Sequence, residues 1–338
     1  MLRYTSSQMV FRGQLLGKYR IIEPLGSGGF GTVYLAEDTF ITRRVAVKVP
    51  HRQNLDFGEL LKEPRLLAAL NHPNIVTVIT AEKQDGVFFI VMEYVPGETL
   101  EHIIHAKGAL DLGVALDYTC QICNAVDHAH KQGVLHRDLR PANVFVTDKG
   151  MLKVGDFGTS RVLEIAAHGT TVIGSPPYMA PEQFEGRAVF ASDIYSLGVT
   201  MYQMLTGSLP YDTPAPSDLD RLRRGELISP PRTRNSSIPQ AIDAIVMRAL
   251  SPTVSARYPR AEDVLTDLLA ARGNMPRRTP APAPDAAHVP EPRTPSHVRH
   301  ATPVRTRTRE VVKGRFCWHC RKPLPARATR CPFCDETQ

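Results

Sequence analysis

His136-Arg137-Asp138-Leu139-Arg140-Pro141-Ala142-Asn143 is the stretch of this sequence that decides the fold, and Asp156-Phe157-Gly158 follows it closely along the chain. Mg²⁺ in proteins prefers carboxylate and carboxamide oxygens, so Asn143 and Asp156 are candidate metal ligands. Asp138 can orient a hydroxyl group that receives a phosphoryl group. Either fragment alone is compatible with an ordinary polar turn. The interpretation therefore depends on what surrounds them.

A glycine-rich run, Gly26-Ser27-Gly28-Gly29-Phe30-Gly31-Thr32-Val33, lies nearer the N-terminus. The G-x-G-x-x-G pattern also serves dinucleotide-binding folds, which need a helix at the last glycine and an acidic residue about 20 positions further on. Here β-rich residues follow and positions 43–55 contain no acidic residue, so that interpretation fails. A hairpin whose backbone N–H groups cover a polyphosphate remains. Lys48, in an apolar run, supplies the cation, and Glu63 can pair with it.

Hydrophobic patterning divides residues 19–272 into two parts. β-rich runs dominate residues 19–95, interrupted by one helical pattern over Phe57–Leu70. Helical spacing dominates the following part, with helices expected over residues 112–130, 192–207, 239–250 and 260–271. Cys120 and Cys123 fall on the first of these helices without a second cysteine pair, which favours packing in the core.

The ordered set of motifs resembles a eukaryotic-type (Hanks-type) serine/threonine protein kinase domain of the bacterial kind, over residues 19–272. Met179-Ala180-Pro181-Glu182 is similar to the end of the kinase activation segment, and Asp193–Gly198 to the helix that braces the catalytic loop. Arg257 matches the arginine that pairs with Glu182. The resemblance implies an α+β, bilobal fold with a β-rich N-lobe (19–95) and a helical C-lobe (96–272).

The resemblance also implies the chemistry: transfer of the ATP γ-phosphate, with Mg²⁺ or Mn²⁺, to Ser and Thr hydroxyls of protein substrates. Asp138 would orient the acceptor hydroxyl, Arg140 would neutralise the γ-phosphate, and Lys48 would hold the α- and β-phosphates. The catalytic set implied in this way is Asp138, Lys48, Arg140, Asn143, Asp156 and Glu63, with Asn143 and Asp156 as the magnesium ligands. A pseudokinase scaffold is the alternative class, and the presence of the whole set argues against it.

The resemblance places the nucleotide between the two lobes. Met92 would be the gatekeeper, with the Glu93 carbonyl and the Val95 amide contacting adenine and Glu98 reaching the ribose or a basic substrate residue. The implied nucleotide-binding residues are Gly26, Ser27, Gly28, Gly29, Phe30, Gly31, Val33, Ala46, Lys48, Met92, Glu93, Val95, Glu98 and Phe145, of which Ala46 and Phe145 sandwich the purine.

Two positions depart from the family pattern. Arg140 stands where most serine/threonine kinases have lysine, which keeps the charge but changes its geometry. Pro64 directly follows Glu63, so that helix begins late or is kinked, and we hypothesise that Pro64 tunes the balance between inactive and active states.

Arg137 beside Asp138 implies activation by phosphorylation of the activation segment. Thr170 and Thr171 are the first candidates for autophosphorylation, and Ser175, Thr159 and Ser160 are weaker ones.

The C-terminus carries a second pattern, Cys317-x₂-Cys320-x₁₀-Cys331-x₂-Cys334. Four thiolates at this spacing can close a structural Zn²⁺ site, and so short a segment needs the metal to fold. Residues 314–338 resemble a small zinc ribbon, although Arg321 and Asp335 stand where glycine commonly follows each knuckle. The alternative is a redox dithiol pair. Residues 273–313, rich in Pro and Arg, are expected to be a disordered linker.

The formal net charge of +7 is unevenly distributed. Residues 274–338 contain 13 Lys and Arg against 5 Asp and Glu, whereas residues 1–273 contain 28 and 29. The basicity therefore points to whatever the tail contacts: a docking partner for the ribbon is favoured over nucleic acid. No apolar run has the roughly 18 residues of a membrane span and no signal peptide is evident, so we expect a cytoplasmic protein without a membrane partner.

Overall fold

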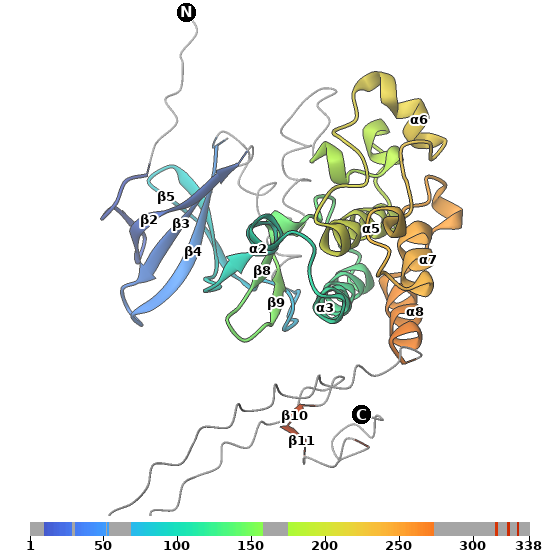
Figure 1. Cartoon of the computed structure of the whole chain (residues 1–338). Helices are drawn as coiled ribbons and strands as arrows, with labels where there is room; N and C mark the ends of the chain where they lie inside the picture. The colour runs from blue at the N-terminus through green and yellow to red at the C-terminus, as the bar shows by residue number, and fades with distance from the viewer. Residues whose placement is uncertain are drawn as a thin grey trace, which may run out of the picture. The chain divides into compact units, whose positions relative to one another are not determined.

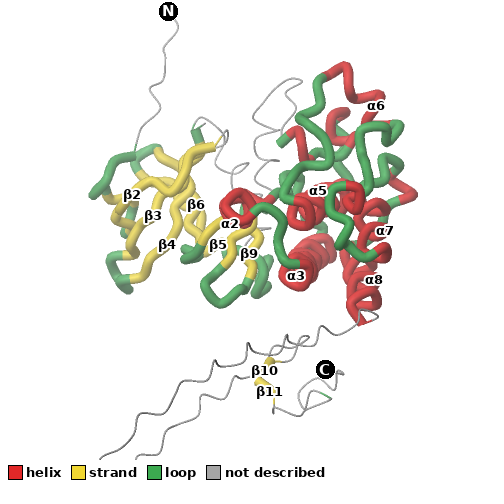
Figure 2. Tube along the Cα trace, viewed as in Figure 1, coloured by secondary structure: helices red, strands yellow, loops and turns green. Residues whose placement is uncertain are grey.

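The computed structural model describes residues 10–28, 31–51, 53, 69–157, 175–273, 315–316, 323–324 and 330. The chain divides into two compact units, Met1–Arg277 and Arg278–Gln338. Within the described part of the first unit, a β-rich region precedes a mainly helical one, as the sequence predicts (Figures 1 and 2).

The β-rich region is a six-stranded antiparallel sheet with the strand order β1-β2-β3-β4-β6-β5. Its strands are β1 (Leu15–Leu16), β2 (Tyr19–Gly28), β3 (Gly31–Asp38), β4 (Arg43–Pro50), β5 (Val78–Gln84) and β6 (Val87–Glu93). Residues 45–49 of β4 and 87–91 of β6 are buried, because these strands are central and both of their faces are covered. Of the glycine-rich run, Gly26–Gly28 form the exposed end of β2, and Gly31 begins β3.

A three-stranded antiparallel sheet follows, made of β7 (Glu98–Thr99), β8 (Val144–Val146) and β9 (Leu152–Val154). Thr99 caps α2 (Leu100–Lys107) by accepting the His102 amide at 3.2 Å. β8 begins directly after His136–Asn143, called the catalytic stretch below, and β9 ends two residues before Asp156. The turn between them therefore brings Asn143 and Asp156 to the same end of this sheet.

The helical region is built around α5 (Phe190–Thr206), which is buried along nearly its whole length. It packs against α3 (Leu112–Lys131) and α7 (Gln240–Ala249), while α8 (Ala261–Gly273) covers α3 and α7 (Figure 1). Shorter helical elements connect these, namely η1 (Pro141–Asn143), η2 (Pro176–Tyr178), η3 (Pro181–Glu185), η4 (Pro216–Asp218), α6 (Leu219–Arg223), η5 (Pro231–Thr233) and η6 (Val254–Ala256).

Four of the observed helices, α3, α5, α7 and α8, start and end within about two residues of the sequence predictions, whereas α2 and α6 were not predicted individually. One expectation needs correction: the helix predicted to reach Leu70 does not, because Ala69 and Leu70 form a turn and a loop. Pro73, three residues on, has no backbone N–H group with which to continue a helix. Residues 57–68 of that prediction lie outside the described residues.

The two cysteines of α3 pack in the core, as predicted. Cys123 is fully buried and Cys120 half-buried, and both are free thiols. Burial raises the pKa of Cys120 to about 11 and that of Cys123 well above its ordinary value. Among the described residues, His, Cys, Asp and Glu form no cluster that could hold a metal ion. None of the helices described here has both the length and the apolar character of a membrane span.

The second unit contributes one short described feature. Arg315–Phe316 (β10) pairs antiparallel with Pro323–Leu324 (β11), with Arg315 opposite Leu324 and Phe316 opposite Pro323.

Candidate active site

Asp193, near the start of α5, fixes the backbone of the catalytic stretch. Its Oδ2 accepts hydrogen bonds from the His136 amide at 2.8 Å and from His130 Nε2 at 2.7 Å, and its Oδ1 accepts the Arg137 amide at 2.8 Å. Burial opposes ionisation of this carboxylate, but the hydrogen bond and charge of His130 outweigh it and lower the pKa of Asp193. The predicted bracing of the catalytic loop is confirmed.

Asp138 is held by neighbours on both of its carboxylate oxygens. The Asn143 amide nitrogen donates to the Asp138 carbonyl at 2.7 Å and to Oδ2 at 3.1 Å, while the Ser175 backbone amide donates to Oδ1 at 3.1 Å. Each carboxylate oxygen has two lone pairs, so these bonds orient Asp138 and leave acceptor capacity for a hydroxyl group. Asn143 uses its nitrogen here, so its carboxamide oxygen points elsewhere.

Asp156 forms an ion pair with Lys48 across the two sheets, with 2.7 Å between Lys48 Nζ and Asp156 Oδ1. Lys48 is 5% exposed, as expected for a lysine on a central strand that has an acidic partner. Burial disfavours the charged form of Asp156, but the ammonium of Lys48 outweighs it, and the pKa of Asp156 is lowered. Glu63 lies outside the described residues, so the Lys48–Glu63 pair stays a prediction.

Strand register shows which predicted nucleotide contacts share a face of the larger sheet. Val33 pairs with Lys48, Ala46 with Met92, and Lys48 with Ile90. Because side chains alternate along a strand, these five lie on one face, while the intervening residues build the core of the other face, including Tyr34, Val45, Val47, Val49 and Val91. The sheet therefore collects the predicted residues Val33, Ala46 and Met92 on the face that carries Lys48, and Ile90, which was not predicted, lies on the same face.

A small cavity of about 20 Å³ lies beside the Lys48–Asp156 pair, roughly the room for one water molecule. Its other lining residues are apolar: Leu70, Ile75, Val76, Val78, Ile90, Met92 and Phe157. Met92 thus borders a space next to the ion pair, which fits the expected gatekeeper position. Phe157 is buried against His136, with 4.5 Å between ring centroids.

An ion pair between β6 of the larger sheet and β9 of the smaller one was missed by sequence reasoning. Lys153 Nζ lies 2.6 Å from Glu93 Oε1, which also accepts the Thr77 amide at 2.9 Å. Both side chains are mostly buried, at 17% and 18% exposed. Val95 is half-buried, whereas Glu98 is exposed and lies 3.7 Å from His102 Nε2. No sequence signal marks Lys153, since an alternating strand predicts only an exposed lysine there.

Gly31 and Gly155 are two of the glycines that have no room for a side chain. A Cβ on Gly31 would lie 2.5 Å from the Val49 carbonyl oxygen, so β3 and β4 need glycine at this point. A Cβ on Gly155 would lie 2.9 Å from Phe145 Cε2. Gly155, which the sequence analysis did not single out, therefore lets the expected purine-contacting ring pack against the residue before Asp156. Gly26, Ser27 and Gly28 are exposed.

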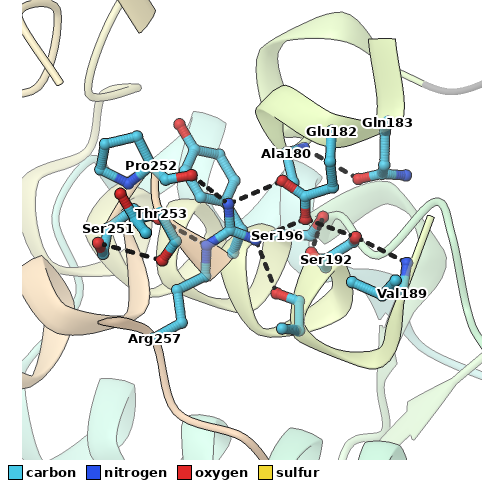
Figure 3. A network of polar contacts seen from close by, with 12 residues as sticks. Ala180, Glu182, Gln183, Val189, Ser192, Ser196, Ser251, Pro252, Thr253 and Arg257 are labelled. Atoms are coloured by element: carbon cyan, nitrogen blue, oxygen red, sulfur yellow. Dashed lines mark hydrogen bonds and ion pairs between the residues drawn. The ribbon is translucent and has the colours of Figure 1, made fainter. Parts of the chain in front are cut away.

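Glu182 and Arg257 form the predicted ion pair (Figure 3). Arg257 NH1 and NH2 lie 2.6 and 2.8 Å from the two Glu182 carboxylate oxygens. Ser192 Oγ donates to the same carboxylate at 2.7 Å. The pair connects the segment 175–185 to α5 and to the chain before α8.

Several predicted residues lie outside the described residues, and their placement is not tested. They are Gly29, Phe30, Glu63 and Pro64, the candidate phosphosites Thr159, Ser160, Thr170 and Thr171, and the candidate zinc ligands Cys317, Cys320, Cys331 and Cys334. Of the candidate phosphosites, Ser175 lies within the described residues, and its backbone amide donates a hydrogen bond to Asp138 Oδ1.

Residues 19–271 match the family described as "Protein kinase domain". The chain belongs to the protein kinase domain family. A solved structure of Rad53 residues 1–466 in complex with AMP-PNP is similar to it, with a TM-score of 0.64, 27% sequence identity, and coverage of 74% of this chain and 64% of that one.

Among curated proteins, the chain is 36% identical over 264 residues to the probable serine/threonine-protein kinase CPE1738 of Clostridium perfringens, covering 76% of this chain and 38% of the relative. It is 35% identical over 268 residues to the serine/threonine-protein kinase PrkC of Bacillus subtilis (77% and 41%). It is 35% identical over 293 residues to PknB of Mycobacterium tuberculosis (82% and 46%). The chain spans less than half the length of these relatives.

Proposed function

We propose that this chain is an ATP-dependent protein serine/threonine kinase. The observation that carries the proposal is Asp138, held by Asn143 and the Ser175 amide in the same site as the Lys48–Asp156 pair. Relatives that match 76–82% of this chain are named serine/threonine-protein kinases, and the similar Rad53 structure contains the ATP analogue AMP-PNP. ATP and a Ser or Thr hydroxyl are therefore the proposed substrates.

The proposed reaction is a single in-line transfer. The oxygen of the acceptor hydroxyl forms a bond to the γ-phosphorus of ATP as the bond from that phosphorus to the bridging oxygen breaks, and ADP leaves with the electron pair. The Asp138 carboxylate accepts the hydroxyl proton. Lys48 and Arg140 supply fixed positive charge for the phosphate oxygens.

A divalent metal ion fits the side chains at this site. Asn143 and Asp156 offer a carboxamide oxygen and a carboxylate, the oxygen donors that Mg²⁺ or Mn²⁺ prefers. The lowered pKa of Asp156 keeps that carboxylate ionised at neutral pH. When bound, such an ion offsets the negative charge of the phosphates.

The test is to incubate purified wild type and Asp138→Asn with ATP and Mg²⁺, and to map phosphosites by mass spectrometry. We expect incorporation by wild type, on itself or on generic basic substrates, and a loss of at least about 10²-fold in Asp138→Asn, as for removal of a general base. If wild type incorporates phosphate neither into itself nor into the generic substrates, the proposal is wrong.

The same experiment tests the finer proposal that the kinase autophosphorylates its activation segment. Thr170 and Thr171 are the expected sites, and Arg137 is the expected partner of the phosphate. Incorporation confined to other residues would contradict this part alone.

We also propose that the C-terminal unit is a zinc ribbon used to dock a partner or substrate. What supports it is the antiparallel pairing of Phe316 with Pro323, which brings together the two ends of the segment that carries Cys317 and Cys320. Metal analysis should find one zinc ion per wild-type chain and none in a Cys317→Ser/Cys320→Ser variant, with transfer to a short peptide equal in both. A wild-type chain without zinc would contradict this proposal and leave the kinase proposal intact.

A further inference from the structure

Gln183 connects the catalytic stretch, at Arg137, to the segment Ser175–Ala180. It lies in η3, is 8% exposed, and makes hydrogen bonds with both ends of its carboxamide. Its Oε1 accepts the Ala180 amide at 2.9 Å, and its Nε2 donates to the Arg137 carbonyl oxygen at 2.9 Å. Figure 3 shows Gln183 beside Ala180 with the bond between them. Because a backbone N–H can only donate and a carbonyl can only accept, these partners fix the orientation of the carboxamide.

The bond to Arg137 matters because of the backbone conformation there. Arg137 has φ = 68°, in the left-handed region that a residue with a side chain rarely adopts. Its N–H group is held by Asp193 Oδ1 at 2.8 Å, and its carbonyl group is held by Gln183. Hydrogen bonds on both sides therefore keep this residue in its unusual conformation.

The carbonyl of Arg137 also belongs to the peptide plane that leads into Asp138. A peptide group is planar, so fixing the direction of its C=O fixes the direction of its N–H and of the next Cα. Asp193 acts one peptide earlier and does not set this plane. The N–H group of this plane, on Asp138, donates to His136 Nδ1 at 3.4 Å, a long hydrogen bond from within the same loop. The other hydrogen bonds of Asp138 come from Asn143 and Ser175, and Ser175 begins the segment that Gln183 anchors through Ala180.

We propose that Gln183 is a positioning residue that couples the segment Ser175–Ala180 to the orientation of the Asp138 carboxylate. An ordered segment holds Gln183, and Gln183 holds the peptide plane before Asp138. Displacing the segment would release that plane, so Asp138 would be aligned only when the segment is in place. This inference rests on the proposed phosphoryl transfer, and it predicts an effect on kcat rather than on the affinity for ATP.

The variant Gln183→Glu removes the hydrogen-bond donor to the Arg137 carbonyl and keeps the acceptor for the Ala180 amide. A carboxylate at this position still accepts the Ala180 amide but cannot donate to the Arg137 carbonyl. A protonated carboxyl group donates again, so lowering the pH should restore the bond. Ionisable groups on the neighbouring elements are Arg137, Asp138, Asp193, the Glu182–Arg257 pair, and two histidines, His136 and His130, and all of these are unchanged in the variant. The informative quantity is therefore the ratio of variant kcat to wild-type kcat at each pH.

The experiment measures kcat and the KM for ATP of the full chain between pH 6 and 8, with a generic basic Ser/Thr substrate. We expect Gln183→Glu to lower kcat about tenfold or more at pH 8 with the KM for ATP unchanged, and the ratio to rise at least about threefold towards pH 6. Gln240→Glu, the same charge change at an exposed position at the start of α7, should give a ratio near one at every pH.

Three results would overturn the inference: a kcat of Gln183→Glu close to wild type at pH 8, a reduced ratio that does not change with pH, or a KM for ATP that rises in proportion to the loss. If Gln183→Glu does not fold, Gln183→Met removes the donor without adding a charge. It should lower kcat at unchanged KM for ATP and without any recovery at pH 6, and a wild-type kcat would again overturn the inference. Wild type that transfers no phosphate contradicts the proposed function instead.

Discussion

Replacing Arg257 with alanine is expected to lower the free energy of unfolding of the kinase domain by about 3–5 kcal/mol, the cost of removing one partner of a buried ion pair. The Arg257 side chain is fully buried, and the Glu182 side chain is 11% exposed. The guanidinium also donates to backbone carbonyls of Ser251, Ala191 and Pro252 at 2.5, 3.0 and 3.0 Å. Alanine leaves these acceptors and the Glu182 carboxylate in a buried site, where Ser192 is the one side-chain donor to that carboxylate that we observe among the described residues.

The magnitude can be converted into a melting temperature. For a domain of about 150–250 residues, 1 kcal/mol corresponds to about 2–4 °C, so Arg257→Ala should lower Tm by roughly 6–20 °C. Calorimetry or circular dichroism on the full chain measures this shift. Arg260→Ala is the matched control, because the Arg260 side chain is 60% exposed and pairs with Asp263 at the surface. Its Tm should equal that of wild type within the error of the measurement.

The pH dependence gives a second check on the same pair. Burial alone would raise the pKa of Glu182, but the hydrogen bonds from Arg257 and Ser192 outweigh it and lower this pKa below its ordinary value of 4.5. The stability that Glu182 contributes is therefore present above about pH 4.5 and is lost as the pH falls through the lowered value. Arg257→Ala should lose less stability than wild type in this acid range. A Tm equal to that of wild type at pH 7, or the same shift in Arg260→Ala, would refute the reasoning.

Three further predictions follow from individual contacts. Lys153→Met removes the ion-pair partner of Glu93 and should raise the KM for ATP about three- to tenfold with little change in kcat. A hydrogen bond between charged groups contributes about 1.5–3 kcal/mol, and we expect only part of this energy to affect the backbone next to Glu93. An unchanged KM would contradict a role for this pair in shaping the nucleotide site. Gly155→Ala should raise the same KM and weaken binding of an ATP analogue, because the added methyl group displaces the Phe145 ring. Isothermal titration with the analogue measures this affinity. An affinity equal to that of wild type would show that the ring can move without consequence. Cys120, with its pKa raised to about 11, should be alkylated slowly in the folded chain at pH 7.5 and rapidly in denaturant, as peptide mass spectrometry can resolve; equal rates would contradict its burial.

Much of the fold was accessible from sequence because its signals are local. Alternating and helical hydrophobic patterns depend on near neighbours. They predicted the sheet region, and they predicted the four helices α3, α5, α7 and α8 within about two residues. The motif around Asp138 predicted which side chains could share a site, since spacing within a short loop restricts where they can point. The end of the helix expected near Leu70 was wrong, because pattern alone does not mark where a turn overrides helical spacing.

The sequence by itself determined the family, the charge division between the two parts of the chain, and the identities of the residues that can handle phosphate. The family resemblance also implied one distant pair, Glu182 with Arg257. Only the tertiary structure decided which other distant groups are paired. Lys48 and Asp156 are separated by 108 positions, Glu93 and Lys153 by 60, and Gln183 and Arg137 by 46. Such pairs depend on how the sheets and helices pack. No local sequence pattern indicates that Gln183 hydrogen-bonds to the peptide group that precedes Asp138. The sequence therefore identified the residues that can carry out the chemistry, whereas their arrangement in space is a property of the folded chain.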